Sequence, residues 1–165
     1  MPLWLRAAAF IAMLPAAIGG WIPWLIAGPR TAPSPGAAPA IAVFALGWAI
    51  VLWCAYDFVR RGRGTPAPYD PPRALVTGGL YTVTRNPMYV GVLTAVAGEA
   101  IAWPSWRMLL YAAVVALGFH ARVVLYEEPR LSRSFGADFA RYCARVPRWF
   151  ALPWRPRRST GTGTS

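Results

Sequence analysis

Long hydrophobic windows alternate with short polar stretches along most of the chain. The windows cover residues 4–27, 40–59, 88–103 and 108–126. Each approaches the length of about 20 mainly apolar residues that an α-helix needs to cross a bilayer. The pattern therefore predicts an all-α, multi-pass membrane helix bundle.

Several residues that disturb a helix interrupt the first window. Pro15, Gly19, Gly20 and Pro23 predict a kink or a break near its far end. Whether this window forms one helix or two is left open, so we expect four to five transmembrane helices. Its apolar run is too long for a secretory signal and is followed by more membrane-like sequence, so we interpret it as an anchor.

Composition supports a membrane location, and the arginines predict an orientation. Hydrophobic residues make up 56% of the chain and charged residues 14%, with a net charge of +11. Arginines are concentrated between the second and third windows and after the fourth, whereas only Arg30 and Arg107 lie in the other two connections. Because basic residues in short loops prefer the cytoplasm, both termini should be cytoplasmic. We expect an integral protein of a bacterial inner membrane, with membrane lipids as partners and no nucleic acid, since no folded basic module is evident.

The stretch GGLYTVTRNPMYVG, residues 78–91, brings polar side chains to the start of the third window. If the third window runs outward and the fourth returns, residues 85–89 and 126–130 lie at the same cytoplasmic level. Two polar clusters that are distant in sequence then become neighbours. The Pro- and Gly-rich stretch 60–79 favours turns and is interpreted as a folded flap over this face.

These clusters combine two carboxylates, a guanidinium, an amide and two phenols: Glu127, Glu128, Arg85, Asn86, Tyr81 and Tyr89. Carboxylates accept hydrogen bonds from hydroxyls or an ammonium, an arginine binds a carboxylate, and aromatic faces attract a sulfonium. S-adenosylmethionine carries hydroxyls, an ammonium, a carboxylate and a sulfonium. The alternative is that the residues only anchor the protein at the membrane interface, where Tyr and Arg are common.

The motif order adds a resemblance to a known family. "LVTGGLYTVTRNPMYVG" followed by "EEPRLSRSFGADFARYCARVPRW" resembles the isoprenylcysteine carboxyl methyltransferases, within the wider group of membrane methyltransferases that includes the phospholipid methyltransferases. The similarity covers residues 65–149. It implies an enzyme with a cytoplasmic cofactor pocket, which takes S-adenosylmethionine from the cytosol and a lipophilic small-molecule acceptor from the bilayer.

The resemblance also implies positions for the cofactor contacts. They would come from Leu75, Val76, Tyr81, Asn86, Pro87, Met88, Tyr89 and Glu127, with Arg85 and Glu128 supporting them. Family members commonly have histidine in place of Asn86 and tyrosine in place of Phe139. Val123 occupies the place of an arginine that faces the acceptor in the carboxyl methyltransferases, with Arg122 beside it.

The geometry around Pro87 gives Asn86 a predicted role. Proline disfavours helical geometry at the preceding residue, so Asn86 should be extended just ahead of the third helix. Its side chain and carbonyl would then be free to face a ligand, and Tyr89 would close the other side.

Three further residues are candidates for the substrate site. His120 lies seven residues before Glu127, which predicts the same helix face, and it either packs or lines an acceptor cavity. Glu99 lies deep in the third window, where an ionisable group tends to face the bundle interior. Arg122 is the third candidate. No metal site or disulfide is indicated by Cys54 and Cys143.

The chain is divided into three parts by these patterns. Residues 1–59 are N-terminal transmembrane helices, 60–150 a methyltransferase core, and 151–165 a disordered tail. Within the core, residues 132–150 show helix-like spacing of Phe135, Phe139 and Tyr142, which predicts an interfacial helix that closes the site.

The favoured function is an S-adenosylmethionine-dependent methyltransferase. No catalytic residue is assigned, because a sulfonium leaving group departs without protonation and the protein mainly has to position the reactants and exclude water. The acceptor, which could be a carboxylate, thiol or amine, and the oligomeric state stay open. The alternatives are a membrane reductase that uses NADPH and a non-catalytic scaffold of the same fold.

Overall fold

The structure is a computed structural model that describes residues 5, 9, 13–27, 37–62 and 75–150. All regular elements in these ranges are helices, as the sequence predicts. In chain order they are η1 (Ala17–Trp21), α2 (Ile22–Ala27), α3 (Ala37–Asp57), η2 (Phe58–Gly62), η3 (Gly79–Thr82), α4 (Pro87–Ala102), α5 (Trp106–Arg122), η4 (Val123–Glu127) and α6 (Glu128–Arg145).

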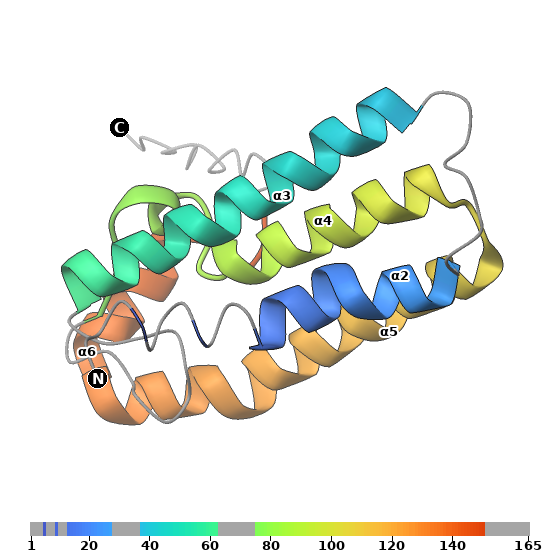
Figure 1. Ribbon diagram of the computed structural model, residues 1–165. Coiled ribbons are helices and arrows are strands. Elements are labelled where there is room, and N and C mark those ends of the chain that lie inside the picture. Colours follow the sequence, from blue (N-terminus) through green and yellow to red (C-terminus); the bar gives the residue numbers. More distant parts are fainter. Residues whose placement is uncertain (1–4, 6–8, 10–12, 28–36, 63–74, 151–165) are drawn as a thin grey trace, which may run out of the picture.

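The long helices lie side by side along a common direction (Figure 1). α3 packs along α4, α4 also contacts α5 and η1, and α2 contacts α5. The short connection from α4 to α5 is at one end of the bundle, and η3 and α6 are at the other end (Figure 1). The end with η3 and α6 is where the two polar clusters of the sequence meet.

Glycines allow α3 and α4 to approach closely. A Cβ atom on Gly47 would lie 2.4 Å from the Ala95 nitrogen, and one on Gly98 would lie 2.6 Å from the Phe44 nitrogen. Gly91 faces α3 in the same way, with 2.9 Å to the Gly47 carbonyl oxygen. Small residues at such contacts are typical of packed membrane helices, where close backbone approach replaces the hydrophobic effect as the source of stability.

Local sequence signals fix the ends of α4 and α5. Asn86 is the N-cap of α4 and Pro87 is its first residue, a position where proline loses no helical hydrogen bond. α4 ends where the Trp103 amide donates to the Glu99 carbonyl at 2.8 Å. Ser105 then caps α5 by accepting a hydrogen bond from the Met108 amide at 3.2 Å.

The predicted kink in the first window is confirmed. η1 is a π-helical turn in which Gly19 leaves the helical conformation, at φ −99° and ψ 18°. α2 starts directly after it, with Pro23 in its first turn.

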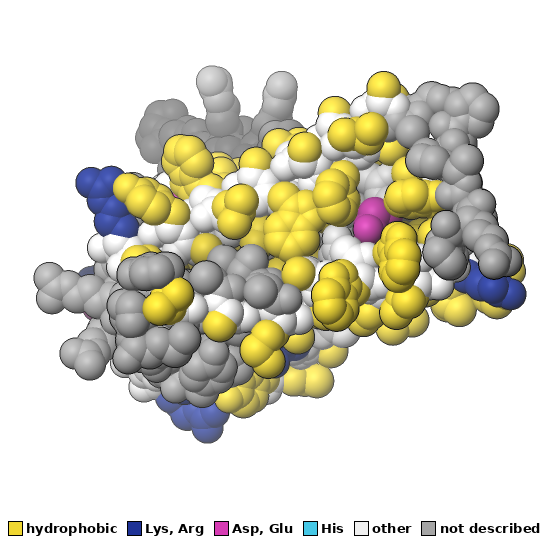
Figure 2. Space-filling model, viewed as in Figure 1, with side chains coloured by type: hydrophobic (Ala, Val, Ile, Leu, Met, Phe, Trp, Pro, Cys, Tyr) yellow, Lys and Arg dark blue, Asp and Glu magenta, His cyan; other side chains and the backbone are white. Residues whose placement is uncertain are grey.

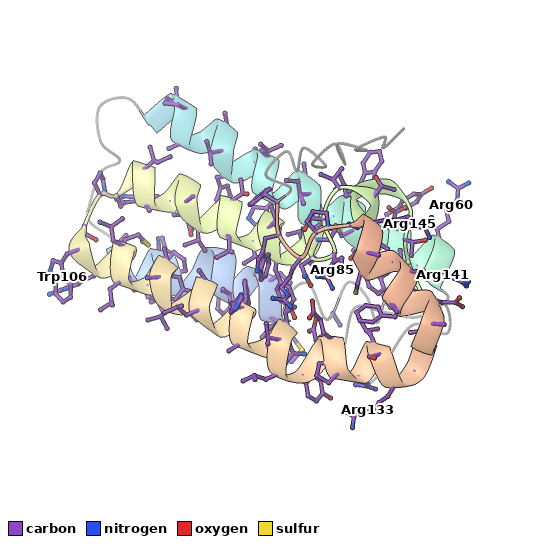
Figure 3. The ribbon with its side chains drawn as sticks, turned by 180° about the vertical axis from the view of Figure 1, so that it is seen from behind. Arg60, Arg85, Trp106, Arg133, Arg141 and Arg145 are labelled. Atoms are coloured by element: carbon purple, nitrogen blue, oxygen red, sulfur yellow. The ribbon has the colours of Figure 1, made fainter. Side chains whose placement is uncertain are left out.

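Two helices among the described residues are long and apolar enough to cross a membrane, namely 38–60 and 106–145. The helices at 13–27 and 87–102 are apolar but shorter. The expectation of four to five spans therefore stays a prediction. The face in Figure 2 is mostly hydrophobic along the helices, with arginines towards its ends, and Figure 3 labels Arg60, Arg85, Arg133, Arg141 and Arg145 at the end opposite to Trp106.

The last long helix is not straight. α5 continues through the π-helical turn η4 into α6, and α6 then bends at Gly136, which has φ +48°. After the bend α6 folds back towards η3 (Figure 3). The predicted tail helix therefore exists, but it begins at Glu128 and not at residue 132, because η4 leads into it directly and Pro129 suits its first turn. The predicted disordered tail lies outside the described residues, and so does most of the predicted flap.

Candidate functional site

A cavity of about 150 Å³ lies at the end of the bundle that holds η3 and α6. Its walls come from η1 and the residues just before it, from η2, from residues 75–92 with η3 and the first turns of α4, from the end of α5, and from η4 and α6. The lining residues are Leu14, Pro15, Ile18, Phe58, Leu75, Val76, Tyr81, Arg85, Asn86, Met88, Tyr89, Val92, Phe119, Arg122, Glu127, Leu131 and Tyr142. Most of the wall is therefore apolar or aromatic, and the charged groups are few.

One polar network on this wall joins three helical segments. The Tyr89 hydroxyl donates a hydrogen bond to Glu127 Oε1, and Arg122 Nε donates both to that oxygen and to the Tyr89 hydroxyl, each at 2.9 Å. The Tyr89 ring also packs on Phe119, with 4.5 Å between ring centroids. These contacts fix the Glu127 carboxylate at one of its two oxygens, and no hydrogen bond to the other oxygen is formed by the described residues.

A second charged group, Arg85, enters the cavity from the turn before α4. Its Nη1 donates to Cys143 Sγ at 2.7 Å and lies 2.9 Å from Glu128 Oε1. Its Nε is buried and has no hydrogen-bond partner among the described residues. A buried donor without an acceptor is costly, so this nitrogen marks a place where a ligand oxygen would be favourable.

The segment 146–150 forms a strap that is bonded to the turn before α4 and to the start of α6. Arg148 donates to both oxygens of Glu128, from Nε at 2.8 Å and from Nη2 at 2.7 Å. The hydrogen bond with Glu128 raises the pKa of Arg148 above its ordinary value, so this paired form is charged at neutral pH. The strap backbone is held as well, because the Arg85 amide donates to the Pro147 carbonyl at 2.9 Å.

Asn86 also holds the strap, which differs from its predicted freedom to face a ligand. Its Nδ2 donates to the Arg148 carbonyl at 3.0 Å, and its own carbonyl accepts from the Val90 amide at 3.2 Å. Asn86 still lines the cavity and is non-helical, at φ −129° and ψ 50°. The side chain is thus committed to a structural contact that a histidine N–H could also make.

Tyr81 lines the cavity and also belongs to a small core. It packs with Cys54 and Val76, and its carbonyl accepts a hydrogen bond from the Tyr142 hydroxyl at 2.7 Å. The turn that places Tyr81 depends on Gly79, which has φ +63° and leaves no room for a Cβ, since one would lie 2.3 Å from Asp57 Oδ2. Tyr142 belongs to the predicted aromatic stripe of α6, and Phe139 of the same stripe is also buried.

Most of the residues predicted to contact a cofactor meet at this cavity. Leu75, Val76, Tyr81, Arg85, Asn86, Met88, Tyr89 and Glu127 line it. Pro87 starts α4 beside it, and Glu128 ties Arg85 to the strap. Arg122, predicted for the substrate, lines the same cavity.

His120 and Glu99 lie elsewhere. His120 lines a groove between α4 and α5 and accepts a hydrogen bond at Nδ1 from Trp149 Nε1 at 3.2 Å, whereas Glu99 lines a small cavity between α3 and α4. The expectation that His120 and Glu127 share one helix face is wrong. The π-helical turn η4 lies between them and changes the angle per residue on which the seven-residue spacing relied.

The sequence analysis missed Arg148 and the apolar wall from residues 14–18. Arg148 directly follows the Arg-Val-Pro of the motif, and its partner Glu128 was already a candidate, so an arginine next to that motif was an available signal. Nothing in the sequence of the first window indicates that it faces the cavity. Among the described residues, no group of three or more His, Cys, Asp or Glu side chains could hold a metal ion.

We expect Glu128→Gln to loosen the strap. Glutamine keeps the shape but removes the charge that two arginines share, and a partly buried charged hydrogen bond contributes on the order of 1–2 kcal/mol. Limited trypsin digestion should then cut faster at the arginines of residues 145–148. Asp138→Asn is the matched control, because its ion pair with Arg141 is exposed, and such pairs contribute little. Equal cleavage of the two variants would contradict the role of Glu128 in holding the strap in place.

Comparisons with known proteins agree with the sequence motifs. Residues 37–138 match the model of the phospholipid methyltransferase family. Protein-S-isoprenylcysteine O-methyltransferase B of Arabidopsis thaliana is 36% identical over 73 residues, which are 44% of this chain and 37% of that protein. Its relative, protein-S-isoprenylcysteine O-methyltransferase A, is 32% identical over 78 residues, or 47% of this chain and 40% of that protein.

A third relative is named for metal resistance and not for methyl transfer. Cobalt-zinc-cadmium resistance protein CzcN of Cupriavidus metallidurans is 34% identical over 116 residues, which are 69% of this chain and 46% of that protein. The chain thus spans less than half the length of each of these curated relatives. No solved structure matches significantly.

Proposed function

Because the chain belongs to the phospholipid methyltransferase family, we propose that its cavity binds S-adenosylmethionine and that a methyl group is transferred there to a lipophilic acceptor. The observation that carries the proposal is the buried Arg85 Nε, which has no hydrogen-bond partner in the described part of the chain and lies in the same cavity as the Glu127 carboxylate. A guanidinium donor without an acceptor and a carboxylate with a free oxygen suit a ligand that carries both signs of charge.

The remaining wall fits the same ligand. Arg85 Nε would bind the ligand carboxylate, and the second oxygen of Glu127 would accept from its ammonium or a ribose hydroxyl. Tyr89 and Phe119 offer aromatic faces to a positively charged centre, and the apolar side chains of Met88 and Val76 keep water away. S-adenosylmethionine would supply an activated methyl group on a positively charged sulfur.

The chain would act mainly by positioning and by excluding water. Arg122 is held by Tyr89 and Glu127 through its Nε, which leaves its terminal nitrogens available to orient an acidic acceptor. A carboxylate or thiolate acceptor needs no proton removed, whereas an amine or thiol must lose one. The strap held by Glu128 and Arg148 would close the site on the cytoplasmic side.

The acceptor would reach the site from the bilayer. A groove of about 500 Å³ between α4 and α5 is lined by Val90, Leu93, Thr94, Ala97, Ala116, Leu117, His120, Trp149 and Phe150. It lies directly behind the cavity wall, because Tyr89 and Phe119 line the cavity while their neighbours Val90 and His120 line the groove. A hydrocarbon chain lying in this groove would bring its polar end close to Arg122. We place this end of the protein in the cytoplasm because the arginines are gathered there (Figure 3).

Arg85→Gln should weaken binding of labelled S-adenosylmethionine to the detergent-purified protein about tenfold or more. The reason is the loss of a charged donor, whose hydrogen bonds contribute about 1.5–3 kcal/mol. Arg141→Gln is the matched control, since Arg141 is exposed on α6 and pairs only with Asp138 among the described residues. NADPH should not bind either protein. Binding of NADPH but not of S-adenosylmethionine to the unsubstituted protein would instead support the reductase, and binding of neither would support a non-catalytic scaffold.

A further inference from the structure

A second cavity of about 160 Å³ lies between α3 and α4, at the end of the bundle away from the proposed cofactor site. Ala40, Ile41, Phe44, Gly98, Glu99, Ala102 and Trp103 line it. Of the described residues that line it, only Glu99 is ionisable. Glu99 lies ten positions after Tyr89 on α4, which corresponds to about 15 Å along a helix. The two cavities are therefore distinct sites.

Glu99 is buried without a full set of partners. The residue is 6% exposed, and its Oε2 is buried and receives no hydrogen bond from any residue that the structure describes. The Tyr111 hydroxyl on α5 does not supply a donor for this oxygen, because it donates to the Ile18 carbonyl at 2.6 Å. Leaving a carboxyl oxygen unpaired in an apolar wall is unfavourable, so a donor from outside the described helices would be bound favourably.

The close packing of α3 and α4 explains why the carboxyl group lies there. Gly98 brings the two backbones together, since a Cβ on it would lie 2.8 Å from the Ala40 carbonyl oxygen. The next residue, Glu99, is thereby held against α3. The aromatic side chains of Phe44 and Trp103 form part of the same wall. A carboxylate beside aromatic rings is the chemistry that binds an ammonium group.

The surroundings indicate where such an ammonium would come from. Hydrophobic side chains at the cavity are exposed. Ile41, which lines it, is 66% exposed, and Ile101, next to the lining residue Ala102, is 46% exposed. Figure 2 shows an acidic side chain enclosed by hydrophobic ones towards this end of α4. A free amine in water gains nothing from this apolar rim, whereas a lipid places hydrocarbon chains on it.

We propose that this cavity binds the ammonium group of a membrane phospholipid, with Glu99 as its counter-ion and Phe44 as an aromatic wall. The site is independent of methyl transfer, because it shares no lining residue with the cofactor cavity. Its occupant would brace the α3 and α4 ends rather than react.

The test is a thermal unfolding titration of the detergent-purified protein with dihexanoylphosphatidylethanolamine, dihexanoylphosphatidylglycerol or free ethanolamine. We expect saturable stabilisation by the phosphatidylethanolamine alone. Glu99→Gln should weaken its apparent affinity at least tenfold, while Asp138→Asn, which removes an exposed carboxylate on α6, should leave it unchanged. Phe44→Leu should weaken it about threefold.

Several outcomes would overturn the proposal. They are equal stabilisation by phosphatidylglycerol, unchanged affinity in Glu99→Gln, or binding of free ethanolamine as strong as that of the lipid. If Glu99→Gln does not fold, the lipids are compared on the unsubstituted protein and on Phe44→Leu. Equal stabilisation of these two proteins by phosphatidylethanolamine would reject the site. None of these measurements uses S-adenosylmethionine, so a failure of the proposed function would not imitate a failure here.

Discussion

Replacing Gly47 with alanine should destabilise the helix bundle by about 1–3 kcal/mol, the range for overpacking a filled interior. The added Cβ would lie 2.4 Å from the Ala95 nitrogen, 2.6 Å from the Gly91 carbonyl oxygen and 2.9 Å from the Ala95 Cα. All three are backbone atoms, which cannot rotate away as a flexible side chain can. The two helices must therefore separate, which would disturb the second cavity between them and the α4 wall of the first cavity. Thermal unfolding in detergent measures the change.

Gly118→Ala provides the matched control for this prediction. It is also a glycine inside a long helix, but beyond the adjoining backbone of its own helix no atom of the described residues lies within 4 Å of the added Cβ. Alanine there should stabilise the protein by about 0.5–1 kcal/mol, because glycine loses more backbone entropy in a helix. The two substitutions are thus expected to have opposite signs. Equal destabilisation by both would show that α3 and α4 are not packed through Gly47.

Sequence reasoning predicted the helices well because their signals are local. Runs of apolar residues and the Pro87 start depend only on neighbouring residues, and they placed α3, α4 and α5 within a few residues. The tight α3 and α4 contact was not predicted. Glycines at positions 47, 91 and 98 carry no sign of which helix they face, and only the packing shows that they meet.

The candidate site was predicted in part for a different reason. The resemblance brought together Arg85, Tyr89 and Glu127, and the structure places all three on one cavity. What the sequence could not give is the direction of a side chain. Asn86 was expected to face a ligand, but its amide group holds the Arg148 carbonyl, a residue 62 positions away.

The π-helical turn η4 is the second source of error. Regular helical periodicity relates His120 to Glu127, but a single turn of different pitch moves Glu127 into the cavity and leaves His120 in the neighbouring groove. The same turn brings Arg122 next to Glu127, five residues away, in an ion pair of 2.9 Å. No residue in Val123–Glu127 is a glycine or proline that would have signalled this change.

Glu127→Gln is the substitution with the largest expected effect on ligand binding. Glutamine fills the same space but loses a negative charge that would balance the ligand ammonium, and charged hydrogen bonds contribute about 1.5–3 kcal/mol. The affinity for S-adenosylmethionine should fall about ten- to a hundredfold. The protein should stay folded, because the carboxylate is partly exposed, at 28% of its side-chain surface. Isothermal titration with S-adenosylmethionine measures the loss, and Asp138→Asn should bind as the unsubstituted protein does.

A double-mutant cycle with Arg122→Gln separates two ways in which Glu127 could act. If Glu127 acts only by positioning Arg122, its replacement should change little once Arg122 is gone, because the partner it orients is absent. If Glu127 contacts the ligand itself, as we propose, the tenfold or larger loss should persist in the Arg122→Gln background. The geometry favours the second outcome, since Tyr89 and Arg122 both bind Oε1 and leave the other oxygen of the carboxylate to the ligand. Loss of the effect in the double variant would reduce Glu127 to a positioning residue.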